Sequence, residues 1–143
     1  MREVILLKEI NDSWPKGVKR TKLREKMLLI LKASEKPLSA RDICDEMQNS
    51  ENNIWLSTIY RSLQLFIEKD IVIKTNIANN TMAVYELNCF KHRHYAVCMN
   101  CHKIVNIEHC PIEQFVPKIE DDHFQITGHN FEVFGFCKDC NRK

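Results

Sequence analysis

Cys98-Met99-Asn100-Cys101 and, further along the chain, Cys137-Lys138-Asp139-Cys140 form two CxxC pairs. Each pair can place two thiolates on a single turn, and two such turns together make the tetrahedral sulfur site that Zn²⁺ prefers. A zinc ion with four protein ligands has no open coordination position for a substrate. The pairs therefore predict a structural zinc site made by Cys98, Cys101, Cys137 and Cys140, and function has to be sought in the rest of the chain.

The chain has 143 residues, seven cysteines, six histidines and a formal net charge of +2. This length allows one ordinary domain or two small ones, and a metal site would compensate small domains for their limited buried surface. No run of about 18 apolar residues is present, so we expect no contact with a membrane. The odd number of cysteines, without a secretion signal, favours metal binding in a reducing, cytoplasmic setting over a disulfide framework.

Basic residues gather near the N-terminus. They are Lys16, Lys19, Arg20, Lys22, Arg24 and Lys26, opposed only by Glu25. Such a cluster is either a solvated helix face or a surface that contacts nucleic-acid phosphates.

The composition changes near residue 88. Before this point the chain has a single cysteine, Cys44, and no histidine, whereas the other cysteines and all histidines follow it. We therefore expect two domains, spanning residues 1–87 and 88–143.

The first part of the chain has the pattern of three helices followed by a hairpin. Apolar residues recur at helical spacing over residues 21–32 and 40–47, and a third helix is predicted to open near Ser57. Residues 71–75 and 82–87 are rich in residues that favour strands, with a turn signal at 78–80. Three helices followed by two strands is the order of a winged-helix domain, in which one helix enters the DNA major groove.

The second part alternates short strands with one helix. We predict strands over 94–97 and 103–107, flanking the first CxxC pair, and strands over 124–127 and 131–134 on either side of Gly128. Pro111 suits the first turn of a helix, which we expect to run to about Glu120. The expected fold is therefore α+β.

Several motifs in a fixed order resemble the ferric uptake regulator family. They are Leu56-Ser57-Thr58-Ile59-Tyr60-Arg61-Ser62-Leu63, Val84-Tyr85-Glu86-Leu87, His92-x-His94-x₃-Cys98-x₂-Cys101, Ile126-Thr127-Gly128-His129-Asn130 and Gly135-Phe136-Cys137-x₂-Cys140. The resemblance implies a homodimeric, metal-responsive transcriptional repressor of metal-homeostasis genes and not an enzyme. It also implies an N-terminal winged-helix DNA-binding domain and a C-terminal α/β dimerisation domain.

The resemblance places the recognition helix at residues 58–61. Tyr60 offers a ring for thymine methyl groups, and Arg61 offers a charged fork for phosphate or guanine. The predicted DNA-binding residues are Lys19, Arg20, Ser57, Thr58, Tyr60 and Arg61, and the expected partner is an A·T-rich palindromic operator. The alternative for Tyr60 is an aromatic side chain that packs against the wing.

The resemblance also implies a regulatory metal site. Its predicted ligands are His92, His94, Glu113 and His129. Three imidazoles and a carboxylate suit Zn²⁺, and also Fe²⁺ or Mn²⁺.

The chain departs from the family at a second site, which normally draws on both domains. Only Glu86 is retained there, and Pro37, Arg93 and Tyr95 stand where the family has histidines. Peroxide sensing needs Fe²⁺ at this site, so the departure argues against it. Four unassigned residues could rebuild the site, and their soft sulfur donors favour zinc over iron. They are Cys44, Cys89, His109 and Cys110.

We therefore expect a zinc sensor, with an iron-sensing or peroxide-responsive member of the same family as the alternative. Three readings from other classes stay open at this stage. They are a zinc enzyme, a redox switch that releases zinc when the cysteines are oxidised, and a zinc-stabilised interaction module.

Overall fold

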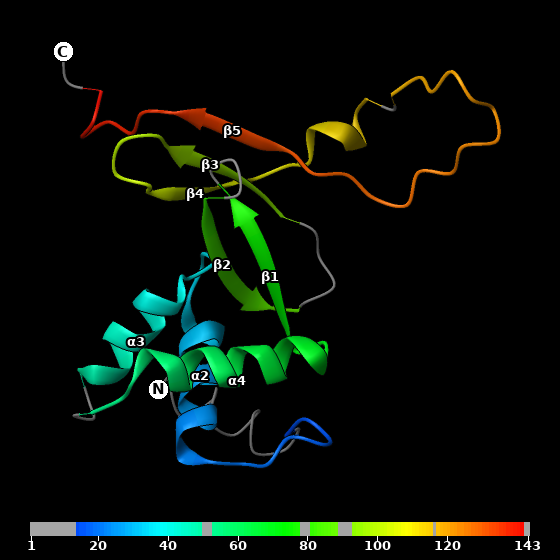
Figure 1. Ribbon diagram of the computed structural model, residues 1–143. Coiled ribbons are helices and arrows are strands. Elements are labelled where there is room, and N and C mark those ends of the chain that lie inside the picture. Colours follow the sequence, from blue (N-terminus) through cyan, green and yellow to red (C-terminus); the bar gives the residue numbers. More distant parts are fainter. Residues whose placement is uncertain (1–13, 50–52, 78–80, 89–92, 116, 142–143) are drawn as a thin grey trace. The chain divides into compact units, whose positions relative to one another are not determined.

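The computed structural model describes residues 14–49, 53–77, 81–88, 93–115 and 117–141 (Figure 1). It divides into two compact units, Met1–Phe90 and Lys91–Lys143, each of which is described here by itself. From the sequence we placed this boundary after residue 87. No helix in the described ranges has the length and apolar character needed to cross a bilayer.

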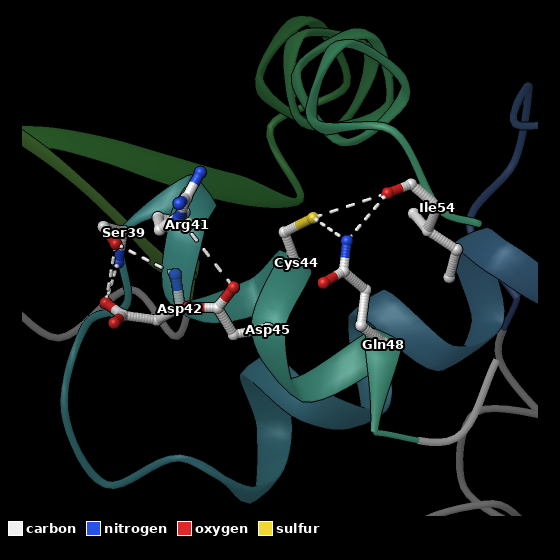
Figure 2. Close-up of polar contacts among 7 residues, drawn as sticks. All are labelled: Ser39, Arg41, Asp42, Cys44, Asp45, Gln48 and Ile54. Carbon is white, nitrogen blue, oxygen red and sulfur yellow. Dashed lines mark hydrogen bonds and ion pairs between the residues drawn. The ribbon is translucent and has the colours of Figure 1, made fainter. Parts of the chain in front are cut away.

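Among the residues that the structure describes, the first unit has three helices: α2 (Lys22–Ala33), α3 (Ala40–Gln48) and α4 (Leu56–Glu68). Thr21 begins α2 by accepting a hydrogen bond from the backbone N–H of Arg24. Ser39 and Asp42 form a capping box at the start of α3, in which each side chain accepts from the backbone N–H of the other, at 3.1 and 2.9 Å (Figure 2). These reciprocal bonds satisfy two N–H groups that a helix otherwise leaves without partners.

A two-stranded wing follows α4. Strands β1 (Val72–Ile77) and β2 (Met82–Leu87) pair antiparallel, and Leu38 adds a bridge to Tyr85 on the outer side of β2. Apolar faces of the three helices and the wing enclose one core, whose most buried members include Met27, Ile43, Met47, Ile59, Leu63 and Phe66. The predicted α+β fold with a winged-helix unit is confirmed.

Cys44 lies in this core, on α3. Its thiol is 3.7 Å from the carbonyl oxygen of Ile54 and 3.6 Å from the side-chain amide of Gln48, which also donates to Ile54 (Figure 2). The thiol thus helps to fix the segment that leads into α4. Among the described residues Cys44 joins no group of metal ligands, so we interpret it as a packing residue.

The second unit is a three-stranded sheet in the order β4–β3–β5. The central strand β3 (His94–Cys98) is antiparallel to β4 (Ile104–Ile107) and parallel to β5 (Glu132–Gly135). The hairpin between β3 and β4 carries the first CxxC pair, and the second pair follows β5 directly. The parallel pairing therefore brings the two CxxC pairs to the same end of the sheet.

Two predicted elements of the second unit are wrong. In place of a helix from Pro111 to Glu120, the described residues of this segment form a single 3₁₀ turn, η1 (Pro111–Glu113). Pro117 explains this, because a proline disfavours helical backbone immediately before it and supplies no N–H. Residues 124–127 form no strand, and no described segment pairs with them.

Candidate metal centres and DNA-binding surface

The first candidate metal centre, which we call the four-cysteine cluster, contains Cys98, Cys101, Cys137 and Cys140. Their four sulfur atoms lie within 4.8 Å of one another, and those of Cys101 and Cys137 are 3.7 Å apart. A zinc tetrahedron with bonds of about 2.3 Å would separate its sulfurs by roughly 3.8 Å. The residues fit the ion, so this cluster can hold a structural zinc.

The surroundings of this cluster distinguish its cysteines. Hydrogen bonds from the backbone of Cys101 and of Cys137 lower the pKa of Cys98 to about 6. The side-chain amide of Asn100 lowers the pKa of Cys140, but contacts with the neighbouring thiols and burial outweigh it and raise that pKa to about 11. Cys98 is therefore the anchored thiolate, and Cys140 holds its proton until a cation displaces it.

A second group of ligand atoms lies at the start of the same sheet. The Nε2 atoms of His94 and His129 are 3.0 Å apart, and the sulfur of Cys110 is 3.3 Å from the first and 3.1 Å from the second. The three residues come from the first position of β3, the residue before η1 and the loop before β5. His94 and Cys110 are buried, whereas His129 is exposed.

The ring of His94 is oriented by the backbone. Its Nδ1 atom lies 3.2 Å from the carbonyl oxygen of Phe131. A carbonyl oxygen can only accept, so Nδ1 carries the hydrogen and, in the neutral ring, Nε2 presents its lone pair to Cys110 and His129. Metal-binding histidines are commonly held in this way, through a hydrogen bond from the nitrogen that does not bind the metal.

The structure brings together some of the residues predicted for the regulatory site and not others. His94 and His129 meet, as expected for two ligands of one site. Glu113 is exposed on η1 and does not belong to the group of ligand atoms around them. His92 lies outside the described residues. Cys110 takes part instead, although in the sequence it was only an unassigned cysteine.

The four positions that replace the family's second site offer little to a metal. Pro37 and Tyr95 are buried, Glu86 is half-buried and Arg93 is exposed. None of them belongs to a group of potential ligands within the described ranges. Cys89, which could rebuild such a site, lies outside those ranges, and His109 joins no ligand group within them.

The predicted DNA-binding residues of α4 occupy its first turns. Ser57 and Thr58 lie in the opening turn, which has no side-chain cap and so presents backbone N–H groups. Tyr60 and Arg61 are exposed. A groove runs beside them, lined by Tyr60, Arg61, Leu63, Gln64, Ile67, Lys74 and Tyr85. Burial, and then the neighbouring Tyr60, raise the pKa of Tyr85, which therefore stays neutral in this groove.

Lys19 and Arg20 precede α2, and both are exposed. The guanidinium of Arg20 forms an ion pair with Glu25 and lies 5.4 Å from the centre of the Trp14 ring. Contacts within its own unit thus fix the Arg20 side chain, and the Glu25 carboxylate offsets part of its positive charge.

Comparisons with known proteins agree with this arrangement. The model of the Ferric uptake regulator family matches residues 15–134. The ferric uptake regulation protein of Campylobacter upsaliensis is 32% identical over 130 residues, which cover 89% of this chain and 83% of that protein. The peroxide-responsive repressor PerR of Staphylococcus saprophyticus is 33% identical over 132 residues, covering 89% and 85%. The solved structure of the Helicobacter pylori ferric uptake regulator Fur aligns with a TM-score of 0.71 at 21% identity, covering 99% of this chain and 95% of that one.

A winged-helix unit and a unit with metal-ligand clusters together define a metal-responsive transcription regulator. The chain belongs to the ferric uptake regulator family. Members of this family are regulators that bind DNA and divalent metals and form dimers, and they are not enzymes. The reading as a zinc enzyme is therefore wrong.

Proposed function

We propose that this protein is a zinc-responsive repressor of metal-homeostasis genes that acts in the cytoplasm. The observation that carries the proposal is the presence of two different ligand clusters in one small unit. The four-cysteine cluster is closed and made only of sulfur, which suits a permanent structural zinc. The cluster at His94 and His129 brings only three ligand atoms together within the described residues, which leaves a position for exchange and suits reversible binding of a second ion.

Zinc is favoured over iron for two reasons. The site that an iron-based peroxide sensor would use keeps only Glu86 and has Pro37, Arg93 and Tyr95 in place of imidazoles. Imidazole and thiolate donors also bind Zn²⁺ more tightly than Fe²⁺ or Mn²⁺. Iron sensing is the alternative, since the relatives include proteins named for ferric uptake and for the response to peroxide.

The metal would act by shifting a population of conformations. A bound cation links the start of β3 to the segments that carry Cys110 and His129, and it favours whichever dimer arrangement has those segments together. A coupling free energy of about 1–3 kcal/mol would change the affinity for the operator by about 5–150-fold.

DNA recognition is assigned to the exposed face of α4. Ser57 and Thr58 would bind phosphates from the opening turn, where the helix dipole adds to the attraction. Tyr60 and Arg61 would contact bases, and Lys74 across the groove would contact the backbone. Lys19 and Arg20 would lie along a narrow A·T-rich minor groove. A dimer presents two such helices, so the operator is expected to be palindromic.

The test is a binding titration under reducing, anaerobic conditions. Protein with one zinc per chain is mixed with a fluorescent A·T-rich palindromic duplex, and DNA binding is followed by anisotropy at increasing free Zn²⁺, Fe²⁺ or Mn²⁺. The variants are His129→Ala, which removes an exposed ligand, and Arg61→Gln, which removes a DNA contact. We expect Zn²⁺ to activate the unmodified protein at the lowest free concentration, His129→Ala to lose the response, and Arg61→Gln to bind DNA weakly at every metal concentration.

Other results would contradict the proposal in distinct ways. Activation by Fe²⁺ at lower free concentration than Zn²⁺ would make the protein an iron sensor. DNA binding that ignores every metal would remove the regulatory site altogether. A full response in His129→Ala would place that site elsewhere.

A further inference from the structure

We propose that Cys110, and not Glu113, is the third protein ligand of the metal site at His94 and His129. The site would then have two imidazoles and one thiolate, and it would select Zn²⁺ or Co²⁺ over the harder Mn²⁺ and Fe²⁺. This inference deepens the proposed function, and its regulatory meaning rests on that function.

The first argument is the convergence of the three ligand atoms. Around a tetrahedral ion with Zn–N bonds of about 2.0 Å and a Zn–S bond of about 2.3 Å, ligand atoms are separated by roughly 3.3–3.6 Å. The three separations here are 3.0, 3.1 and 3.3 Å. A movement of a few tenths of an ångström would therefore open the group around an ion, without a change in the backbone.

The second argument is the number of hydrogens. Nδ1 of His94 donates to Phe131, so Nε2 of the neutral ring has no hydrogen to give. The Cys110 thiol and Nε2 of His129 can supply one hydrogen each, which leaves three close contacts with at most two donors. At least one of the three contacts therefore has no hydrogen bond of its own, and a cation at the centre would satisfy all three atoms together.

The third argument is the path of the chain. Ile107, the last residue of β4, pairs with His94, the first residue of β3. Cys110 follows Ile107 closely, is buried, and points its sulfur back to that same end of the sheet. Glu113 lies one turn further along on η1 and is exposed. The shorter connection therefore places the thiol, and not the carboxylate, beside the imidazoles.

Ordinary packing of a buried cysteine is the competing explanation. Buried thiols are common and usually contact apolar atoms. Here the sulfur contacts two imidazole nitrogens, one of them on a ring that a carbonyl orients. Cys44 offers the contrast within the same chain, since its thiol contacts an amide and a carbonyl and, among the described residues, joins no group of metal ligands.

The experiment uses Co²⁺ as a spectroscopic probe of the full chain. The four-cysteine cluster is first filled with one equivalent of Zn²⁺, and Co²⁺ is then added without oxygen while a zinc-binding dye reports any zinc released. We expect a sulfur-to-cobalt charge-transfer band in the near ultraviolet and intense visible bands of a four-coordinate ion, both saturating at one cobalt per chain. The Cys110→Ser variant should lose the charge-transfer band and bind Co²⁺ at least about tenfold more weakly.

Two further variants separate a ligand from a structural residue. Glu113→Gln should keep both the band and the affinity. Cys110→His should bind Co²⁺ with four-coordinate visible bands but without charge transfer, which shows that the site is intact without sulfur. Persistence of the band in Cys110→Ser, or a loss of affinity in Glu113→Gln alone, would overturn the proposal.

The result of the cobalt experiment does not depend on DNA binding. If the band is present but zinc leaves operator binding unchanged, then Cys110 is a ligand and the proposed function fails. If zinc controls operator binding but the band is absent, then the function stands and the ligand set is wrong.

Discussion

The cysteines of the four-cysteine cluster differ in the pKa of their thiols, and therefore in whether each thiol is protonated near neutral pH. With a pKa of about 6, Cys98 is a thiolate at about pH 8, whereas Cys140, with a pKa of about 11, is a thiol. Zinc binds thiolates, so it displaces a proton from Cys140 at that pH and none from Cys98. As the pH falls through about 6, Cys98 becomes protonated as well, and zinc must then displace one proton more.

We therefore expect proton release on zinc binding to increase by about one proton between pH 8 and pH 5, with a matching fall in zinc affinity. Calorimetry of the first zinc equivalent added to the metal-free protein, in buffers of different ionisation enthalpy, measures this number. A Cys98→Ser variant, which has no thiolate to protonate at this position, should lack the increase. A constant number of released protons in the unmodified protein would contradict the assignment of Cys98 as the anchored thiolate.

His102 has an unfavourable backbone conformation. It follows the first CxxC pair with φ of +60°, a region that glycine adopts without steric cost. We expect His102→Gly to raise the free energy of unfolding of the zinc-loaded protein by about 0.5 kcal/mol, because relief of strain exceeds the added chain entropy. Denaturant unfolding measures this change. His102→Ala keeps the strain and is the control, and equal stability of the two variants would refute the argument.

Residues differ in how far sequence alone could identify them. The grouping of the four cysteines was predictable because each pair is local and its spacing places both sulfurs on one turn. The place of Cys110 beside two histidines was not predictable, because these partners lie in separate elements and no spacing rule links them. The sole hint in the sequence that Cys110 could bind a metal was that no other role had been assigned to it.

At the scale of elements, the capping box of α3 is the clearest local stabiliser. Ser39 accepts from the N–H of Asp42 and its own N–H donates to the Asp42 carboxylate. Ser39→Ala removes the hydroxyl and should lower the free energy of unfolding by about 1 kcal/mol. Thermal unfolding of the zinc-loaded chain tests this. Ser39→Thr retains an oxygen in the same place and should change stability by less, and a loss as large as that of alanine would argue against the cap.

The helices and wing of the first unit were predictable since their signals are local: apolar periodicity, N-caps and a turn between β-branched runs. The pairing of strand β5, in contrast, could not be predicted from the sequence. Residues 131–134 suggested a strand, but the choice of β3 as its parallel partner depends on residues far apart in the chain. The helix expected after Pro111 does not form because a favourable start does not set its length, and Pro117 limits that length.

At the scale of the whole molecule, the second unit exposes apolar side chains. They include Phe115, Phe124, Ile126, Val133, Phe134 and Phe136. Exposed apolar groups in such number mark surfaces that associate, and members of this family are dimers. We infer that these side chains form part of the contact between two copies of the chain.

Replacing Phe124 tests this inference. Phe124→Ser should raise the dimer dissociation constant by about tenfold or more, since burial of a large aromatic side chain is worth more than about 1.4 kcal/mol. Sedimentation at a series of concentrations measures it. Trp55→Ser, which removes an even more exposed aromatic residue from the first unit, should leave the dimer unchanged. Equal effects of the two substitutions would exclude a specific dimer contact at Phe124.

Strands β3 and β5 connect the two candidate metal centres. His94 opens β3 and Cys98 closes it, while His129 precedes β5 and Cys137 follows it. An ion in the four-cysteine cluster therefore clamps the two strands whose other ends form the sensing group. If the protein senses zinc as proposed, each newly synthesised chain consumes one zinc ion before it can report on the next. Under the proposed function, a cell that grows through a long zinc shortage would accumulate metal-free chains that cannot yet respond, and these chains would bind part of the first zinc to return.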